Sequence, residues 1–120
     1  APAGPAHRRG IVALLHADPA LTAPAPFGAM AAAVKRPVGE DRQLAPLDAL
    51  KALTVLPARQ LGEEKTKGSI AAGKLADITV LLANPLKTPA DKLGEIRVTG
   101  VVKEGAAVFG GPDGGVPIIR

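Results

Sequence analysis

The side chains best placed to do chemistry in this sequence are His16 and Asp18, which follow a short apolar run. On an extended strand, residues i and i+2 point to the same face, so the imidazole and the carboxylate would lie side by side. A carboxylate can bind a divalent metal or accept a proton from water, and an imidazole can contact substrate or orient the carboxylate. Each also has an ordinary structural interpretation. Asp18 before Pro19 is typical of a turn, and a lone histidine at a strand end is commonly just hydrogen-bonded.

Other motifs point less clearly to chemistry. The sequence has no cysteine, which excludes disulfides, thiolate metal sites and cysteine nucleophiles. The two histidines, His7 and His16, do not have the spacing of paired zinc ligands. The glycine-rich run at 110–115 is not followed by a helix or by Lys-Ser/Thr, so it does not indicate a phosphate-binding loop. We interpret Lys74 as a solvated turn residue and Asp77 as the residue that opens a strand.

Length and composition are those of one small globular domain. The chain has 120 residues, of which 47% are hydrophobic, and its only aromatic residues are Phe27 and Phe109. The net charge of +4 raises the hypothesis of a nucleic-acid binder. However, acidic residues are interspersed along the chain and no aromatic residues are placed to stack bases, so we expect no nucleic-acid partner. No apolar run reaches the roughly 18 to 20 residues of a membrane span, and the N-terminal residues lack a signal pattern, so we expect a soluble, cytoplasmic protein.

The residues around Asp18 predict one strand-loop-helix unit. Residues 1–9 are rich in Pro, Gly and Ala, and we expect an irregular lead-in there. The apolar run at 11–15 suits a strand that is buried on both faces, as in a parallel sheet. Prolines then forbid regular pairing until a helix begins at Pro26. The apolar positions of this helix have helical spacing: Phe27, Met30 and Val34. Polar residues at the C-terminal end of such a strand are where α/β barrels place their chemistry.

The rest of the chain divides into a helical part and a β-rich part. We predict an exposed connection at 35–45, then a helix that begins at Pro46. Its apolar face is formed by Leu47, Leu50, Leu53 and Thr54. Pro57 breaks or kinks this helix, and Gly62 closes its last turn. Strands are predicted at 77–82, 96–102 and 106–109, with a hairpin turn at 103–105 and a break at Asn84-Pro85. Residues 110–120 are expected to form a flexible tail.

One motif resembles a known family. The run Gly68-Ser-Ile-Ala-Ala-Gly73-Lys-Leu-Ala-Asp77-Ile-Thr-Val-Leu81, followed by Asn84-Pro85, resembles the ending of the amidohydrolase superfamily, which includes urease, dihydroorotase and imidazolonepropionase. His16-Ala17-Asp18, with 24–27 and 31–36, is similar to the YtcJ-like branch of metal-dependent hydrolases, amidohydrolase family 3. Residues 49–61 are similar to the helix pair that usually follows. The resemblance extends from about Gly10 to about Phe109.

The resemblance implies an α/β fold that is only part of a larger one. Residues 10–62 would form the terminal βα unit of a (β/α)8 metal-dependent hydrolase barrel and the C-terminal helices. Residues 63–109 would form the C-terminal half of a small β-sandwich, a composite domain. The remainder of the barrel, with the histidines and the carboxylated lysine or acid that bind metal in the family, would lie on the same precursor or on another chain. We therefore expect this chain to be catalytically incomplete alone.

The resemblance also gives Asp18 a specific role. The family's aspartate at the end of the eighth strand binds a divalent metal, expected here to be zinc, and takes a proton from the water that attacks the substrate. His16 is the expected substrate contact. The implied function is hydrolysis of C–N (amide or imide-like) or related bonds in a small molecule. The alternative is a non-catalytic assembly module that pairs with a partner chain through unpaired strand edges and apolar faces.

Overall fold

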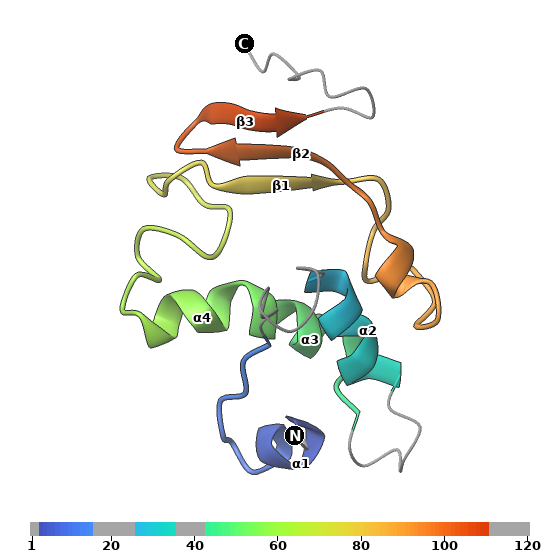
Figure 1. Cartoon of the computed structure of the whole chain (residues 1–120). Coiled ribbons are helices and arrows are strands. Elements are labelled where there is room, and N and C mark those ends of the chain that lie inside the picture. The colour runs from blue at the N-terminus through green and yellow to red at the C-terminus, as the bar shows by residue number, and fades with distance from the viewer. Residues whose placement is uncertain (1–2, 16–25, 36–42, 111–120) are drawn as a thin grey trace, which may run out of the picture.

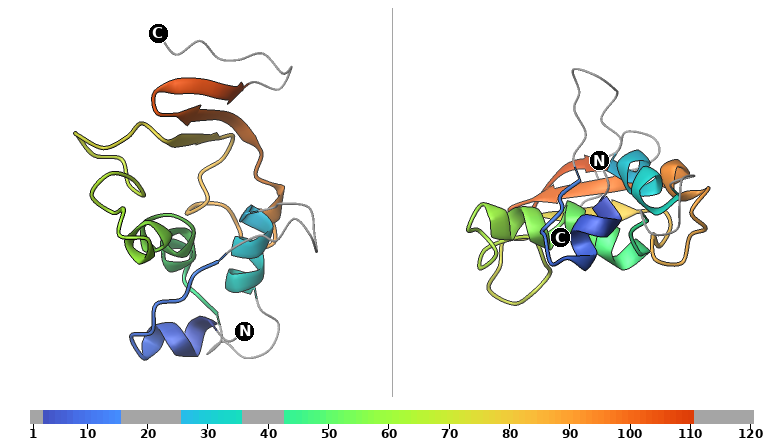
Figure 2. Two further views of the ribbon diagram at one scale, coloured as in Figure 1. Left: turned by 60° about the vertical axis from the view of Figure 1, so that its left-hand side comes forward. Right: turned by 90° about the horizontal axis from the view of Figure 1, so that it is seen from below.

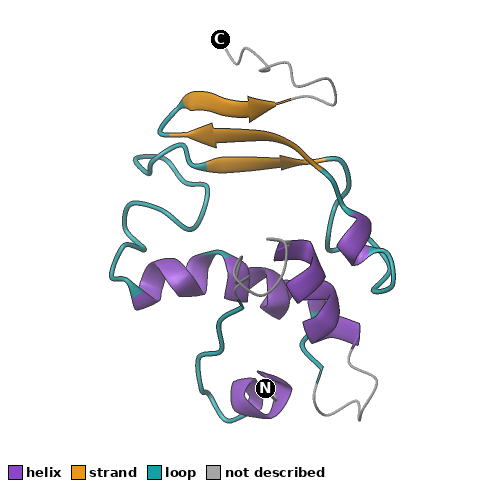
Figure 3. Ribbon diagram, in the orientation of Figure 1, coloured by secondary structure: helices purple, strands orange, loops and turns teal. Residues whose placement is uncertain are grey.

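The computed structural model describes residues 3–15, 26–35 and 43–110. A three-stranded sheet lies on one side of the molecule and a group of helices on the other (Figure 1). The elements are α1 (Ala3–Arg8), α2 (Pro26–Lys35), α3 (Pro46–Leu53), α4 (Val55–Gln60), β1 (Ile78–Leu81), the 3₁₀ helix η2 (Leu93–Glu95), β2 (Val98–Lys103) and β3 (Ala106–Gly110). Helices and strands occupy separate regions, as Figure 3 shows by colour. Within these ranges, no helix has the length and apolar character of a membrane span.

The N-terminal lead-in is helical, which corrects the prediction of an irregular segment at 1–9. α1 accommodates Pro5 because this residue lies in the first turn of the helix, where an N–H would have no helical partner. Gly10, with a φ of 74°, follows the end of the helix, and its N–H donates to the His7 carbonyl at 2.9 Å. Glycine adopts this left-handed conformation at little cost, so it ends a helix readily.

The strand predicted at 11–15 does not form, and this prediction is wrong for the described structure. Ile11 and Val12 are 58% and 61% exposed. The Leu15 N–H donates to the carbonyl of Ala52 in α3, at 3.2 Å, rather than to a neighbouring strand. A strand that is buried on both faces needs other strands beside it. The described residues place none next to this run, so the run has no regular secondary structure and pairs with no strand.

The helix predicted from Pro26 is confirmed as α2. Proline is favourable at the first helical position because its fixed φ suits the helix and its missing N–H has no partner there. Met30, near the middle of α2, has no exposed surface. α2 packs against α3 and against η2.

The helix predicted from Pro46 is divided into α3 and α4 at Thr54, whose φ and ψ are −127° and −86°. Pro57 explains the position of this break. It has no N–H to donate, and its ring clashes with the carbonyl of the residue four positions earlier, Leu53. Gly62, with a φ of 71°, follows α4 as predicted. The apolar face differs from the prediction in one respect: Leu47 is 49% exposed, whereas the buried residues of α3 are alanines, Ala49 and Ala52.

The sheet has the order β1-β2-β3, with both pairs antiparallel. The three predicted strands and the hairpin turn are confirmed. Glu104 and Gly105 form the turn with φ values of 50° and 84°, the two positive values that a two-residue type I′ turn requires. β1 ends before Asn84, whose side-chain Oδ1 accepts the Leu86 N–H at 2.9 Å. This local bond favours a turn over continued pairing.

The core lies among the helices rather than against the sheet. Its buried members are Met30, Ala33, Leu44, Ala49 and Leu93. Leu93 belongs to η2, in the connection between β1 and β2, and this connection packs against α2. The contact joins the sheet to the helical part, and the two views of Figure 2 show the same arrangement. The η2 contact is therefore one place at which the sheet is held to the helices.

Candidate functional site

The predicted site residues His16 and Asp18 lie outside the described residues. His7 is described, and its Nε2 lies 3.3 Å from Oδ2 of Asp48 in α3. Within 3–15, 26–35 and 43–110, no group of three or more His, Asp or Glu side chains could hold a metal ion. The described part of the chain therefore does not by itself supply a set of metal ligands.

A partly open cavity of about 530 Å³ lies between the helices and the sheet in the described part of the chain. On the helical side it is lined by Pro26, Phe27, Leu50, Leu53 and Thr54. The opposite wall is formed by Lys67, Gly68, Ser69, Ile70, Asp77, Ile78, Thr79, Leu81 and Val98. Most of these side chains are apolar, and three on the helical side also pack against the helical core: Phe27, Leu50 and Leu53.

Gly68 positions one wall of the cavity. It has a φ of 90°, and a Cβ on this residue would lie 2.5 Å from Cβ of Ala58 and 3.3 Å from the carbonyl oxygen of Thr54. Only glycine combines the left-handed backbone with so close an approach. The loop that contains Gly68 thus reaches the junction of α3 and α4, which brings its neighbours Lys67 and Ser69 to the cavity.

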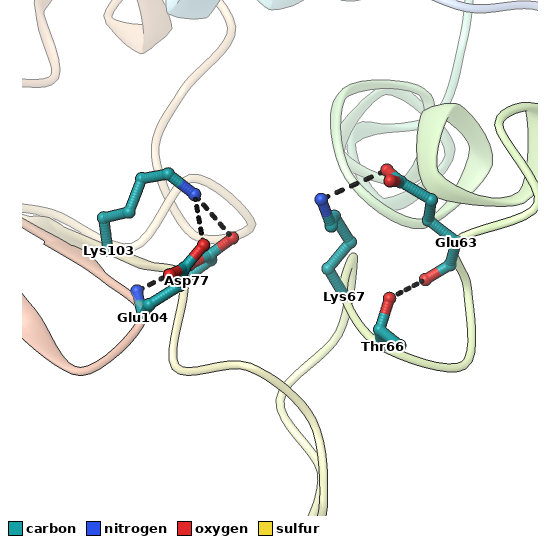
Figure 4. A network of polar contacts seen from close by, with 6 residues as sticks. All are labelled: Glu63, Thr66, Lys67, Asp77, Lys103 and Glu104. Atoms are coloured by element: carbon teal, nitrogen blue, oxygen red, sulfur yellow. Dashed lines mark hydrogen bonds and ion pairs between the residues drawn. The ribbon is translucent and has the colours of Figure 1, made fainter.

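The two charged residues of the lining already have partners (Figure 4). Nζ of Lys67 lies 3.2 Å from Oε2 of Glu63. Oδ2 of Asp77 lies 3.7 Å from Nζ of Lys103, and Oδ1 of Asp77 accepts the Glu104 N–H at 2.8 Å. The Glu104 hydrogen bond, followed by the negative charges of Asp77 and Glu104, raises the pKa of Lys103 above its ordinary value of 10.5. The cavity therefore offers a mainly apolar surface in which each charge is compensated.

The turn near the cavity corrects one prediction. Gly73 has a φ of 84°, as its place in a turn predicts. Lys74, interpreted as solvated, is instead bonded: its Nζ donates to Oγ of Ser69 at 2.7 Å and to the Glu64 carbonyl at 2.5 Å. A long lysine side chain can cross a turn and satisfy a carbonyl that has no other donor, which residue spacing alone does not reveal.

Asp77 has a larger role than the sequence predicted. It directly precedes β1, as expected, but its carboxylate also holds the β2–β3 turn through the Glu104 N–H. The Gly105 N–H donates to the Ala76 carbonyl at 3.1 Å, next to the same contact. The only signal in the sequence was an acidic residue before a strand, which does not identify so distant a partner.

A sequence profile described as "Amidohydrolase family" matches residues 1–109. The chain belongs to the amidohydrolase family. Its structure is similar to the crystal structure of an amidohydrolase from Thermotoga maritima MSB8, with a TM-score of 0.64 and 31% sequence identity. The similarity covers 86% of this chain and 24% of that chain, so the present chain spans about a quarter of the length of that amidohydrolase. No match was found among the curated proteins.

Family membership has a consequence for the metal. Amidohydrolases are hydrolases that generally use a divalent metal. The described residues of this amidohydrolase chain do not supply the ligand set, because no three ligand-type side chains converge within them. The described residues form a small mixed domain of helices and strands, which is similar to part of an amidohydrolase.

Proposed function

We propose that this chain is the C-terminal part of a metal-dependent amidohydrolase that hydrolyses a C–N bond, amide or imide-like, or a related bond in a small molecule. The observation that carries the proposal is the family match over residues 1–109. The match to only 24% of the Thermotoga maritima amidohydrolase further supports it, because most of a complete active site would then come from the other three quarters. On this proposal the chain alone is inactive.

The proposal includes a finer fold. Residues 10–62 would complete a (β/α)8 barrel, and 63–109 would complete a composite β-sandwich. The exposed apolar side chains of Ile11 and Val12 support this arrangement, because a barrel would cover them with neighbouring strands. The segment at 11–15 would then gain its strand pairing only in the assembled barrel.

Asp18 and His16 are the proposed site residues. Asp18 would be a ligand of the metal, zinc in our expectation, and would accept a proton from the attacking water. The C–O bond would form first, and the C–N bond would then break as Asp18 passes the proton to the leaving nitrogen. His16 would contact the substrate. The metal, when bound, supplies a water that loses its proton near neutral pH.

A chimaera tests this function. The quarter of the Thermotoga maritima amidohydrolase that matches this chain is replaced by residues 1–109, and divalent metal content and hydrolysis of N-acyl amino acids, cyclic imides and esters are measured. We expect a folded, metal-containing hydrolase. Asp18→Asn should lower kcat by at least about 100-fold, because a positioned acid or base contributes about that much.

The matched control is Asp48→Asn, which alters an aspartate of α3 that contacts His7. It should leave kcat unchanged. A folded chimaera in which Asp18→Asn and Asp48→Asn have equal activity would contradict the proposed role of Asp18. A folded, metal-loaded chimaera with no activity on any substrate of the panel would contradict hydrolysis of these bonds.

A second candidate function, assembly with a partner chain, is favoured by the apolar cavity beside β1. It predicts that the chain is isolated in a metal-free complex. The split enzyme predicts a second chain together with bound divalent metal, so metal analysis of the purified complex distinguishes the two.

A further inference from the structure

We draw no further inference here: the strongest candidate, the apolar cavity between the helices and β1, belongs to a chain that spans about a quarter of the length of the amidohydrolase it matches, and nothing in the described residues shows what covers this face.

Discussion

The helical part of this amidohydrolase chain and its sheet contain similar apolar side chains but bury them to different extents. Met30 in α2 and Leu93 in η2 have no exposed surface. By contrast, Val80 and Leu82 of the β1 region are 42% and 66% exposed, and Ile70 in the preceding loop is 85% exposed. Most of the buried apolar residues thus belong to the helical part, whereas β1 and its flanks leave apolar side chains partly exposed. The comparison indicates that the helical part contributes more of the buried core than the β1 side does.

The largest expected effect comes from the helical core. Leu93→Ala removes a fully buried side chain at the contact between η2 and α2, so it should destabilise the chain by about 2–5 kcal/mol. Val80→Ala, on the half-exposed face of β1, should cost less than about 1 kcal/mol. Urea unfolding of both variants measures the difference. Equal costs would mean that the sheet buries as much as the helices and would remove the basis of the comparison.

The next effect on stability tests the contact between the Gly68 loop, which leads to the sheet, and the α3–α4 junction of the helical part. Gly68→Ala forces a methyl group against Ala58 at a backbone φ of 90°, so we expect a loss of about 1–3 kcal/mol. Gly73→Ala is the matched control, because its φ is 84° but nothing lies within 4 Å of its would-be Cβ. Gly73→Ala should therefore lose only the stability that corresponds to the strained backbone conformation. If the two variants unfold at the same urea concentration, the contact between the loop and the α3–α4 junction contributes nothing.

Local sequence signals predicted most of the elements. Pro26 and Pro46 mark the first residues of α2 and α3, Pro57 accounts for the break after Leu53, and Gly105 accounts for the hairpin turn. These signals work because proline and glycine restrict the backbone of their own neighbourhood, whatever surrounds them. These predictions from one residue and its sequence neighbours were confirmed, whereas the irregular lead-in predicted from the Pro and Gly residues of 1–9 was wrong, because Pro5 fits the first turn of α1.

Predictions that depend on distant partners fared differently. The run at 11–15 reads as a strand, but strand pairing depends on neighbouring strands that the described residues do not place beside it. Leu47 was expected on the buried face of its helix, yet the close approach of α2 to α3 buries the small Ala49 and leaves Leu47 half exposed. For the candidate site, Asp18 and His16 lie outside the described residues and remain predictions.

A smaller effect on stability tests the hydrogen bond between the Asp77 carboxylate and the β2–β3 turn. Asp77→Ala removes the acceptor for the Glu104 N–H, at the turn where Glu104 has a positive φ, and should cost about 1 kcal/mol. Asp77→Asn keeps an oxygen that can accept this bond and loses only the charge toward Lys103, so it should cost less. Urea unfolding compares them. Equal costs would assign the stabilisation to the charge rather than to the turn.

The smallest expected effect is the pH dependence of Lys103. Its pKa is raised above 10.5, first by the Glu104 hydrogen bond and then by the negative charge of Asp77. A raised pKa in the folded state means that the stabilisation is fully present below the unfolded pKa and is lost as pH rises through the folded one. The difference in unfolding free energy between the unaltered chain and Lys103→Met should therefore shrink as pH rises above about 10.5. Titration of the Lys103 side chain by NMR supplies the control. Glu104→Gln should lower the pKa of Lys103 more than Asp77→Asn does. The reverse order would mean that Asp77, and not Glu104, is the main partner of Lys103.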